Sequence, residues 1–155
     1  MTTHRTTGVS THVFISSGSD VDWARRTVHE LALREGFNEA RAAALATAVT
    51  EIARNIVVHA GRGQISFTPI TDGQQQGIVA VARDDGPGIA DIALAMQDGY
   101  STKGSLGMGL SGAKRLVDEF EIKSAAGAGV TVTLTKWVHA DPDDDWDAVQ
   151  ANPIT

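Results

Sequence analysis

Cysteine is absent from the 155-residue sequence, which excludes disulfide bonds, thiolate metal sites and a cysteine nucleophile. The five histidines show no ligand-type spacing, so we expect no zinc site. Residues 1–10, MTTHRTTGVS, lack the apolar segment of a signal peptide, and no later apolar run approaches the length of a membrane span. We therefore expect a cytoplasmic protein with no membrane partner.

The sequence also has no excess of basic over acidic residues. Thirteen lysines and arginines stand against 19 aspartates and glutamates, which gives a formal net charge of −6. No basic face is evident that could neutralise nucleic-acid phosphates, so we expect no nucleic-acid partner and favour proteins or small ligands. Hydrophobic residues make up 42% and charged residues 21%, which is typical of one globular domain with a real core.

The apolar pattern predicts a folded domain over residues 10–137, between a disordered N-terminus at 1–9 and an acidic tail at 138–155. The expected elements are a strand at 11–16, helices beginning at Ser19 or Asp20 and after Asn38, strands at 63–70 and 77–84, helices at 91–97 and 106–120, and a hairpin of 119–125 with 129–137. Adjacent strands with short turns predict a mostly antiparallel sheet covered by helices on one face. This is an α+β two-layer sandwich, not a doubly wound parallel fold.

Three polar residues in the second long helix form the first candidate cluster. Glu51, Asn55 and His59 are spaced by four residues, so they share one stripe at the rim of the apolar face. A carboxylate beside a carboxamide suits a magnesium–phosphate site, because Glu can take a proton and the Asn oxygen can ligate the ion without adding charge. The alternative is a solvated helix face, with His59 as a cap or packing residue.

The second cluster is the segment ARDDGPGI at the end of a predicted strand. It places Asp84 beside Gly86 and Gly88 in the pattern Asp-x-Gly-x-Gly. The carboxylate can accept a hydrogen bond from an exocyclic amine, and the glycines let a flat base approach closely. The alternative is an ordinary glycine–proline turn.

The third cluster is the glycine-rich stretch DGYSTKGSLGMGLSG. Lys103 precedes Gly104, whereas a Walker A loop needs its lysine after the second glycine. GMGLSG spells the dinucleotide pattern G-x-G-x-x-G, but no apolar strand leads into it. We interpret the stretch as a lid over residues 99–105 followed by Gly107 and Gly109, whose amides begin a helix and favour an anion. A flexible surface loop is the alternative.

The order of these clusters, with a closing glycine turn at Gly129, resembles the N, G1, G2 and G3 boxes of the GHKL, or Bergerat-fold, ATPases. The resemblance covers about residues 10–137. The sequence lacks the dimerisation helix and phosphoaccepting histidine of a sensor kinase, and it lacks a transducer domain. It is therefore similar to the anti-sigma-factor serine/threonine kinases. The segments EIARNIVVHAGRG, DGYSTKGSLGMGL and TKW resemble the RsbT-type stressosome switch kinases in particular.

This resemblance implies ATP and Mg²⁺ as cofactors, with Glu51 as the general base and Asn55 as the metal ligand. It implies that the remaining site residues bind the nucleotide: Asp84, Gly86 and Gly88 at the adenine, and Lys103, Gly104, Gly107 and Gly109 at the phosphates. The G3 element departs from the family pattern, because Val130 stands where threonine is usual. Thr131 could replace that hydroxyl only with a local shift of the strand.

The implied function is phosphorylation of a serine or threonine in a STAS-domain partner. The kinase would then act as a partner switch that activates a PP2C-type phosphatase in a general-stress sigma-factor pathway. Two alternatives remain open. One is an RsbW-type kinase that sequesters a sigma factor, which the GYST and KW segments disfavour. The other is a non-enzymatic GHKL-fold binding module, to which Val130 gives some support.

Overall fold

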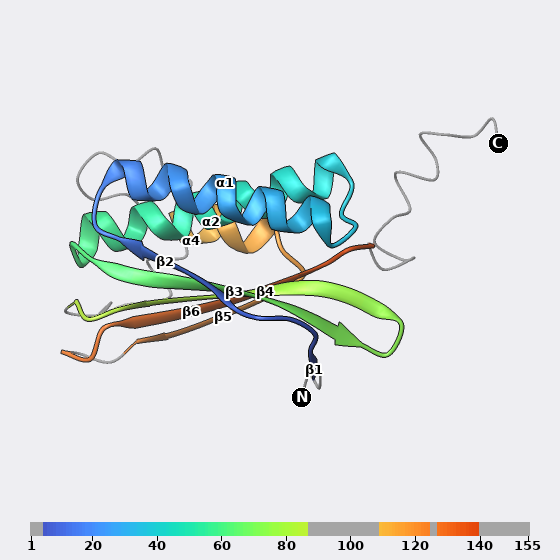
Figure 1. Cartoon of the computed structure of the whole chain (residues 1–155). Coiled ribbons are helices and arrows are strands. Elements are labelled where there is room, and N and C mark those ends of the chain that lie inside the picture. The colour runs from blue at the N-terminus through green and yellow to red at the C-terminus, as the bar shows by residue number, and fades with distance from the viewer. Residues whose placement is uncertain (1–4, 87–108, 125–126, 140–155) are drawn as a thin grey trace.

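The computed structural model describes residues 5–86, 109–124 and 127–139. Helices α1 and α2 and the shorter α4 form one layer, and a six-stranded sheet forms the other (Figure 1). The expected α+β two-layer sandwich is confirmed. The helix predicted at 91–97 and most of the glycine-rich stretch lie outside the described residues.

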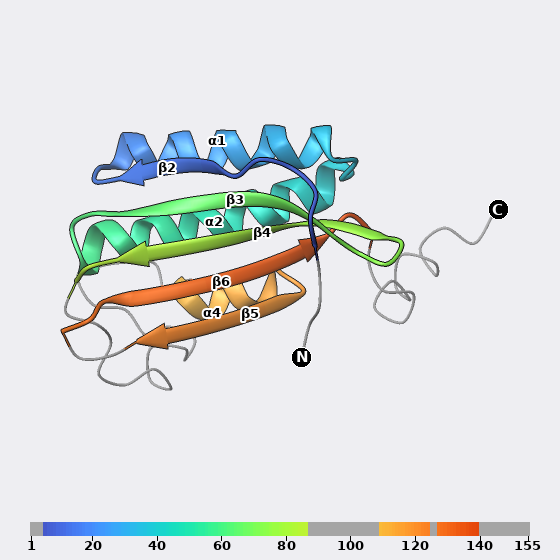
Figure 2. The same cartoon turned by 60° about the horizontal axis from the view of Figure 1, so that its bottom comes forward.

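The sheet is antiparallel throughout, with the strand order β1-β3-β4-β6-β5, and β2 also pairs with β3 (Figure 2). The elements are β1 (Arg5–Thr6), β2 (Thr11–Ile15), α1 (Gly18–Arg34), α2 (Glu39–His59), β3 (Gly63–Asp72), β4 (Gln75–Asp84), α4 (Gly109–Arg115), β5 (Glu119–Ser124) and β6 (Val130–Trp137).

Local capping signals placed the two long helices to within a few residues. Asn38 caps α2 as expected, because its Oδ1 accepts a hydrogen bond from the Arg41 amide at 2.8 Å. The expected start of α1 was wrong, since Ser17 is the cap. Asp20 instead accepts hydrogen bonds from the Ser16 amide and from the Ser16 and Ser17 hydroxyls, and the Ser16 amide is the main reason that its pKa is lowered.

Three other boundaries differ from the sequence predictions. Arg5 and Thr6, expected to be disordered, pair with β3. The β3 and β4 strands continue to a two-residue turn that begins at Gly73, with φ +61°, so glutamines assigned to a loop belong to β4. The α4 helix ends at Arg115, well before the expected 120, because Phe120 pairs with Leu134 in the sheet.

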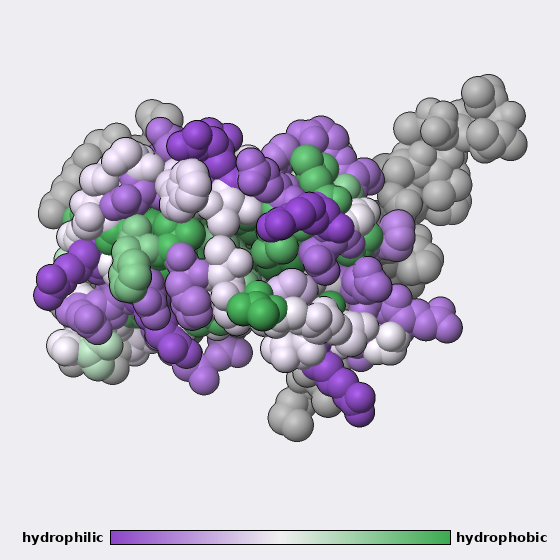
Figure 3. Space-filling view, viewed as in Figure 1, coloured by the Kyte–Doolittle hydropathy of each residue, from purple (hydrophilic) through white to green (hydrophobic). Residues whose placement is uncertain are grey.

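The α2 helix lies between α1 and α4 in the helical layer, packs on the sheet and carries the centre of the core. Its predicted apolar stripe is confirmed, since Leu45, Val49, Ile52 and Ile56 are each at most 3% exposed. On the face seen in Figure 3, apolar side chains occur in separate patches among polar ones. The buried apolar residues of the helices and of the sheet form one cluster between the layers, and the partly buried Glu51 and Asn55 lie at the rim of α2.

A buried lysine joins α4 to the end of β6. Lys136 is only 6% exposed, and its Nζ donates a hydrogen bond of 2.7 Å to the Leu116 carbonyl. Nearby, Asp118 Oδ2 accepts hydrogen bonds from Arg41 Nη2 at 2.9 Å and from the Trp137 amide at 2.8 Å. Burial, with a smaller contribution from the Arg41 guanidinium, lowers the pKa of Lys136 from its ordinary value of 10.5.

Lys136 should therefore make folding stability increase with pH in the alkaline range. Between its lowered folded pKa and 10.5, the unfolded chain binds more protons than the folded chain, so deprotonation favours folding. Urea unfolding at increasing alkaline pH should show the free energy of unfolding of the parent rising relative to that of Lys136→Met. Lys114→Met, at an exposed site on α4, is the control and should show no such trend. A constant difference between the parent and Lys136→Met would contradict the prediction.

Candidate functional site

Glu51 and Asn55 lie at the rim of α2, as their spacing predicted. Both are partly buried, and the neighbouring Ile52 and Ile56 are in the core, whereas His59 is exposed. The Glu51 side chain is 15% exposed, and its Oε1 lies 3.3 Å from Nη1 of Arg54. A carboxylate and a carboxamide are thus held side by side with access to solvent.

Asp84 ends β4 with one carboxylate oxygen fixed by the backbone. Its Oδ1 accepts hydrogen bonds from the Gly86 amide at 2.9 Å and from the Val130 amide at 3.3 Å. Among the described residues, no hydrogen bond reaches Oδ2. The carboxylate is therefore oriented, and Oδ2 has the chemistry to accept a hydrogen bond from a ligand's N–H group.

Glycine packing brings Asp84 and the C-terminal end of α2 together. A Cβ added to Gly86 would lie 2.7 Å from Cβ of Ala60, which directly follows α2. A Cβ added to Gly129, whose φ is +79°, would lie 2.0 Å from the Asp84 carbonyl oxygen. The ends of α2 and β4 and the start of β6 meet at one edge of the molecule, at the left of Figure 2. This edge carries Asp84 and adjoins the helix that carries Glu51.

Part of the predicted nucleotide-binding set lies outside the described residues, namely Gly88, expected at the adenine, and Lys103, Gly104 and Gly107, expected at the phosphates. Gly109 is described and is the first residue of α4, with φ +28°. The α4 helix packs on α2, and Gly112 and Ala113 are buried in it. The glycine-rich stretch therefore leads into a helix that is held against the helix of Glu51 and Asn55.

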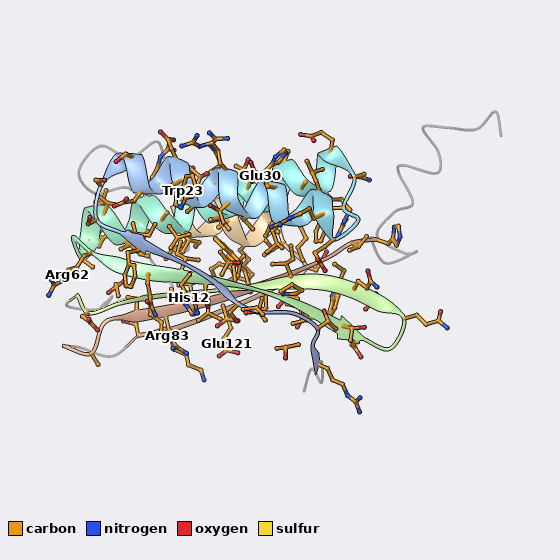
Figure 4. All side chains as sticks on the ribbon, in the orientation of Figure 1. His12, Trp23, Glu30, Arg62, Arg83 and Glu121 are labelled. Carbon is orange, nitrogen blue, oxygen red and sulfur yellow. The ribbon has the colours of Figure 1, made fainter. Side chains whose placement is uncertain are left out.

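Thr131 does not join the other site residues. It pairs with Arg83 of β4, so the two side chains share a face of the sheet. That face is turned away from the helices, as Figure 4 shows for Arg83 and Glu121. Val130, 6% exposed, is on the helix side with Asp84, and its amide rather than a threonine hydroxyl contacts the carboxylate. In this register the Thr131 side chain lies on the opposite face of the sheet from that of Val130.

Two groups of this site, the Val130 amide and Arg54, are not among the residues predicted from the sequence. The contact of the Val130 amide with Asp84 could not be predicted from residue types, because every residue except proline has a backbone N–H donor. Arg54 could have been found, since its three-residue distance from Glu51 is an ion-pair spacing on a helix.

The carboxamide of Asn55, the predicted metal ligand, suits a magnesium–nucleotide complex. Among the described residues, no group of three or more His, Asp or Glu side chains could hold a metal ion. Mg²⁺ commonly uses only one or two protein ligands and completes its shell with waters and substrate phosphates. Asn55 at the rim of α2 is compatible with that arrangement. None of the described helices is both long and apolar enough to cross a membrane.

Comparisons with known proteins identify the family of this fold. The model of the histidine kinase-like ATPase domain matches residues 16–136. The serine/threonine-protein kinase RsbT of Bacillus subtilis (strain 168) is 44% identical over 119 residues, which cover 77% of this chain and 90% of that protein. An anti-sigma F factor of Thermoanaerobacter sp. (strain X514) is 30% identical over 134 residues, covering 83% and 92%. The expected GHKL resemblance is confirmed, and the chain belongs to the histidine kinase-like ATPase domain family.

Proposed function

We propose that this protein is an ATP-dependent serine/threonine kinase that acts on a protein substrate. The observation that carries the proposal is the oriented Asp84 carboxylate at the end of the sheet against which the Glu51 and Asn55 helix packs. The 44% identity to a serine/threonine-protein kinase supports the same activity.

In this proposal Asp84 recognises adenine. Its Oδ2 accepts the exocyclic amine, while Oδ1 stays bound to the Gly86 and Val130 amides. Gly86 and Gly88 leave room for the flat base. The amides of Gly104, Gly107 and Gly109 bind the phosphates, and Lys103 approaches the γ-phosphate.

Glu51 and Asn55 serve the transfer step. The substrate hydroxyl oxygen forms a bond to the γ-phosphorus, the bond from that phosphorus to the β–γ bridging oxygen breaks, and ADP leaves with the electron pair. Glu51 takes the hydroxyl proton. Asn55 contributes an oxygen to hold Mg²⁺, which neutralises phosphate charge when bound. Such chemistry depends mainly on positioning and charge, so a small domain suffices.

The proposed substrate is a STAS-domain protein in the cytoplasm, and the proposed later partner is a PP2C-type phosphatase. The observation behind the alternative, a kinase that sequesters a sigma factor, is the similarity to an anti-sigma F factor at 30% identity, which is lower than the 44% identity to the kinase RsbT. Mixing the protein with labelled ATP, Mg²⁺ and a STAS domain should label the STAS domain. Stable capture of a sigma factor would support the alternative, and absence of both labelling and ATP binding would support a non-enzymatic module.

Asp84→Asn should weaken ATP binding by about 10- to 100-fold, because an amide N–H would face the adenine amine. Isothermal calorimetry with ATP and Mg²⁺ measures this directly. Asp85→Asn is a matched control, since Asp85 is exposed and the charge change is the same. Equal affinities of the two variants would contradict the adenine role of Asp84.

A further inference from the structure

The charged residue Arg54 lies beside Glu51, the proposed base, and has no role in the function proposed above. It lies on α2 directly before Asn55, and its side chain is 60% exposed. Its Nη1 lies 3.3 Å from Oε1 of Glu51, one helical turn earlier. Within the described part of the chain, this is the one polar contact of the Glu51 side chain.

The helix geometry places Glu51 between two different neighbours. At about 100° per residue, Arg54 and Asn55 lie on opposite sides of Glu51, at roughly 60° and 40° around the helix axis. A glutamate has three rotatable side-chain torsions and samples several rotamers when nothing holds it. A guanidinium on one side therefore restricts which way the carboxylate faces.

Because Arg54 is mostly exposed, its contact with Glu51 can orient the carboxylate while adding little to the stability of the fold. A pair in which one partner is mostly in solvent is screened and stabilises a fold little. Arginine stays charged across the working pH range and offers a rigid, planar set of donors. The contact can thus persist in the working enzyme and fix the carboxylate without being needed for folding.

We propose that Arg54 is a positioning residue for Glu51: it binds Oε1 and leaves Oε2 to receive the proton of the substrate hydroxyl. This proposal rests on the function proposed above. Arg54 acts through Glu51 and does not itself contact the nucleotide. Its loss should therefore lower kcat and leave ATP binding unchanged.

The test compares Arg54→Gln, Arg54→Lys and Arg62→Gln with the parent protein. Arg62 is exposed just beyond the end of α2, so Arg62→Gln removes a nearby positive charge without touching Glu51. We expect Arg54→Gln to lower kcat by about tenfold, since small misplacements of reacting groups are costly. The KM and Kd for ATP should stay within about twofold, because phosphate and adenine contacts are unchanged. Arg54→Lys keeps the positive charge but not the planar donors, so it should restore only part of the rate, and Arg62→Gln should match the parent.

A second readout keeps this inference separate from the kinase proposal. Carbon-13 relaxation of the Glu51 side chain, measured without substrate, should show an ordered carboxylate arm in the parent and a mobile one in Arg54→Gln. If the parent transfers no phosphate but Glu51 loses order in Arg54→Gln, the kinase proposal fails and the positioning role stands. An ordered Glu51 in Arg54→Gln, an unchanged kcat, or an equal loss in Arg62→Gln would overturn the positioning role.

Discussion

Glu51→Gln should reduce kcat for phosphate transfer by about 10²- to 10⁴-fold, the usual contribution of general base catalysis. The amide has nearly the shape of the carboxylate and keeps an oxygen for the contact with Arg54. It cannot accept the hydroxyl proton. Asp84 is unaffected, so the Kd for ATP should change by no more than about twofold.

Single-turnover transfer from labelled ATP, combined with calorimetry, checks both parts of this prediction. Glu30→Gln is the control, since Glu30 is an exposed glutamate on α1 and the charge change is identical. A Glu51→Gln or Glu51→Ala variant that transferred phosphate as fast as the parent would show that another group is the base. A variant that lost ATP binding as well would indicate a structural role for Glu51.

Gly129→Ala should destabilise the protein by about 3–5 kcal/mol, the sum of a left-handed backbone and a steric overlap. Its φ is +79°, and the new Cβ would lie 2.0 Å from the Asp84 carbonyl oxygen and 2.9 Å from the carbonyl carbon. Both neighbours are backbone atoms of a central strand, so the overlap is relieved only by moving β4 or β6. ATP affinity should fall with stability, because such a movement displaces the Val130 amide from Asp84.

Urea unfolding of the nucleotide-free protein measures the stability change. Gly127→Ala isolates the backbone contribution, since Gly127 has a similar φ of +74° but, among the described residues, no atom outside its chain neighbours within 4 Å of the added Cβ. That variant should lose only about 1–2 kcal/mol, the cost of a left-handed residue with a side chain. Equal losses in the two variants would mean that close packing on Asp84 is unimportant.

Much of the fold was predictable because its signals are local. The apolar stripe of α2 and its Asn38 cap each depend on residues within a few positions, and the helix ends just before Gly61, whose φ is +85°. The antiparallel sheet followed from adjacent strands with short turns. The errors occurred where distant pairing overrides local preference, as at Phe120, whose place in β5 is set by β6.

The candidate site likewise has features that the sequence alone predicts and features that depend on distant contacts. By itself, the sequence determined that Glu51 and Asn55 share a helix stripe, because a spacing of four residues fixes their relation within one helix. It also placed Asp84 at the end of a strand beside glycines that can turn tightly. Strand alternation alone determined that Thr131 and Val130 face opposite sides, once β6 had been located.

Only the tertiary structure decided how these pieces meet. Packing of Gly129 and Gly86 against Asp84 and Ala60 brings β6 and β4 to the end of α2. Because of the register between β4 and β6, the Val130 amide, and not the Thr131 hydroxyl, donates a hydrogen bond to the Asp84 carboxylate. Strand register depends on contacts between residues far apart in the chain, and local periodicity does not specify those contacts. The residues of the site could therefore be predicted from the sequence, but their arrangement could not.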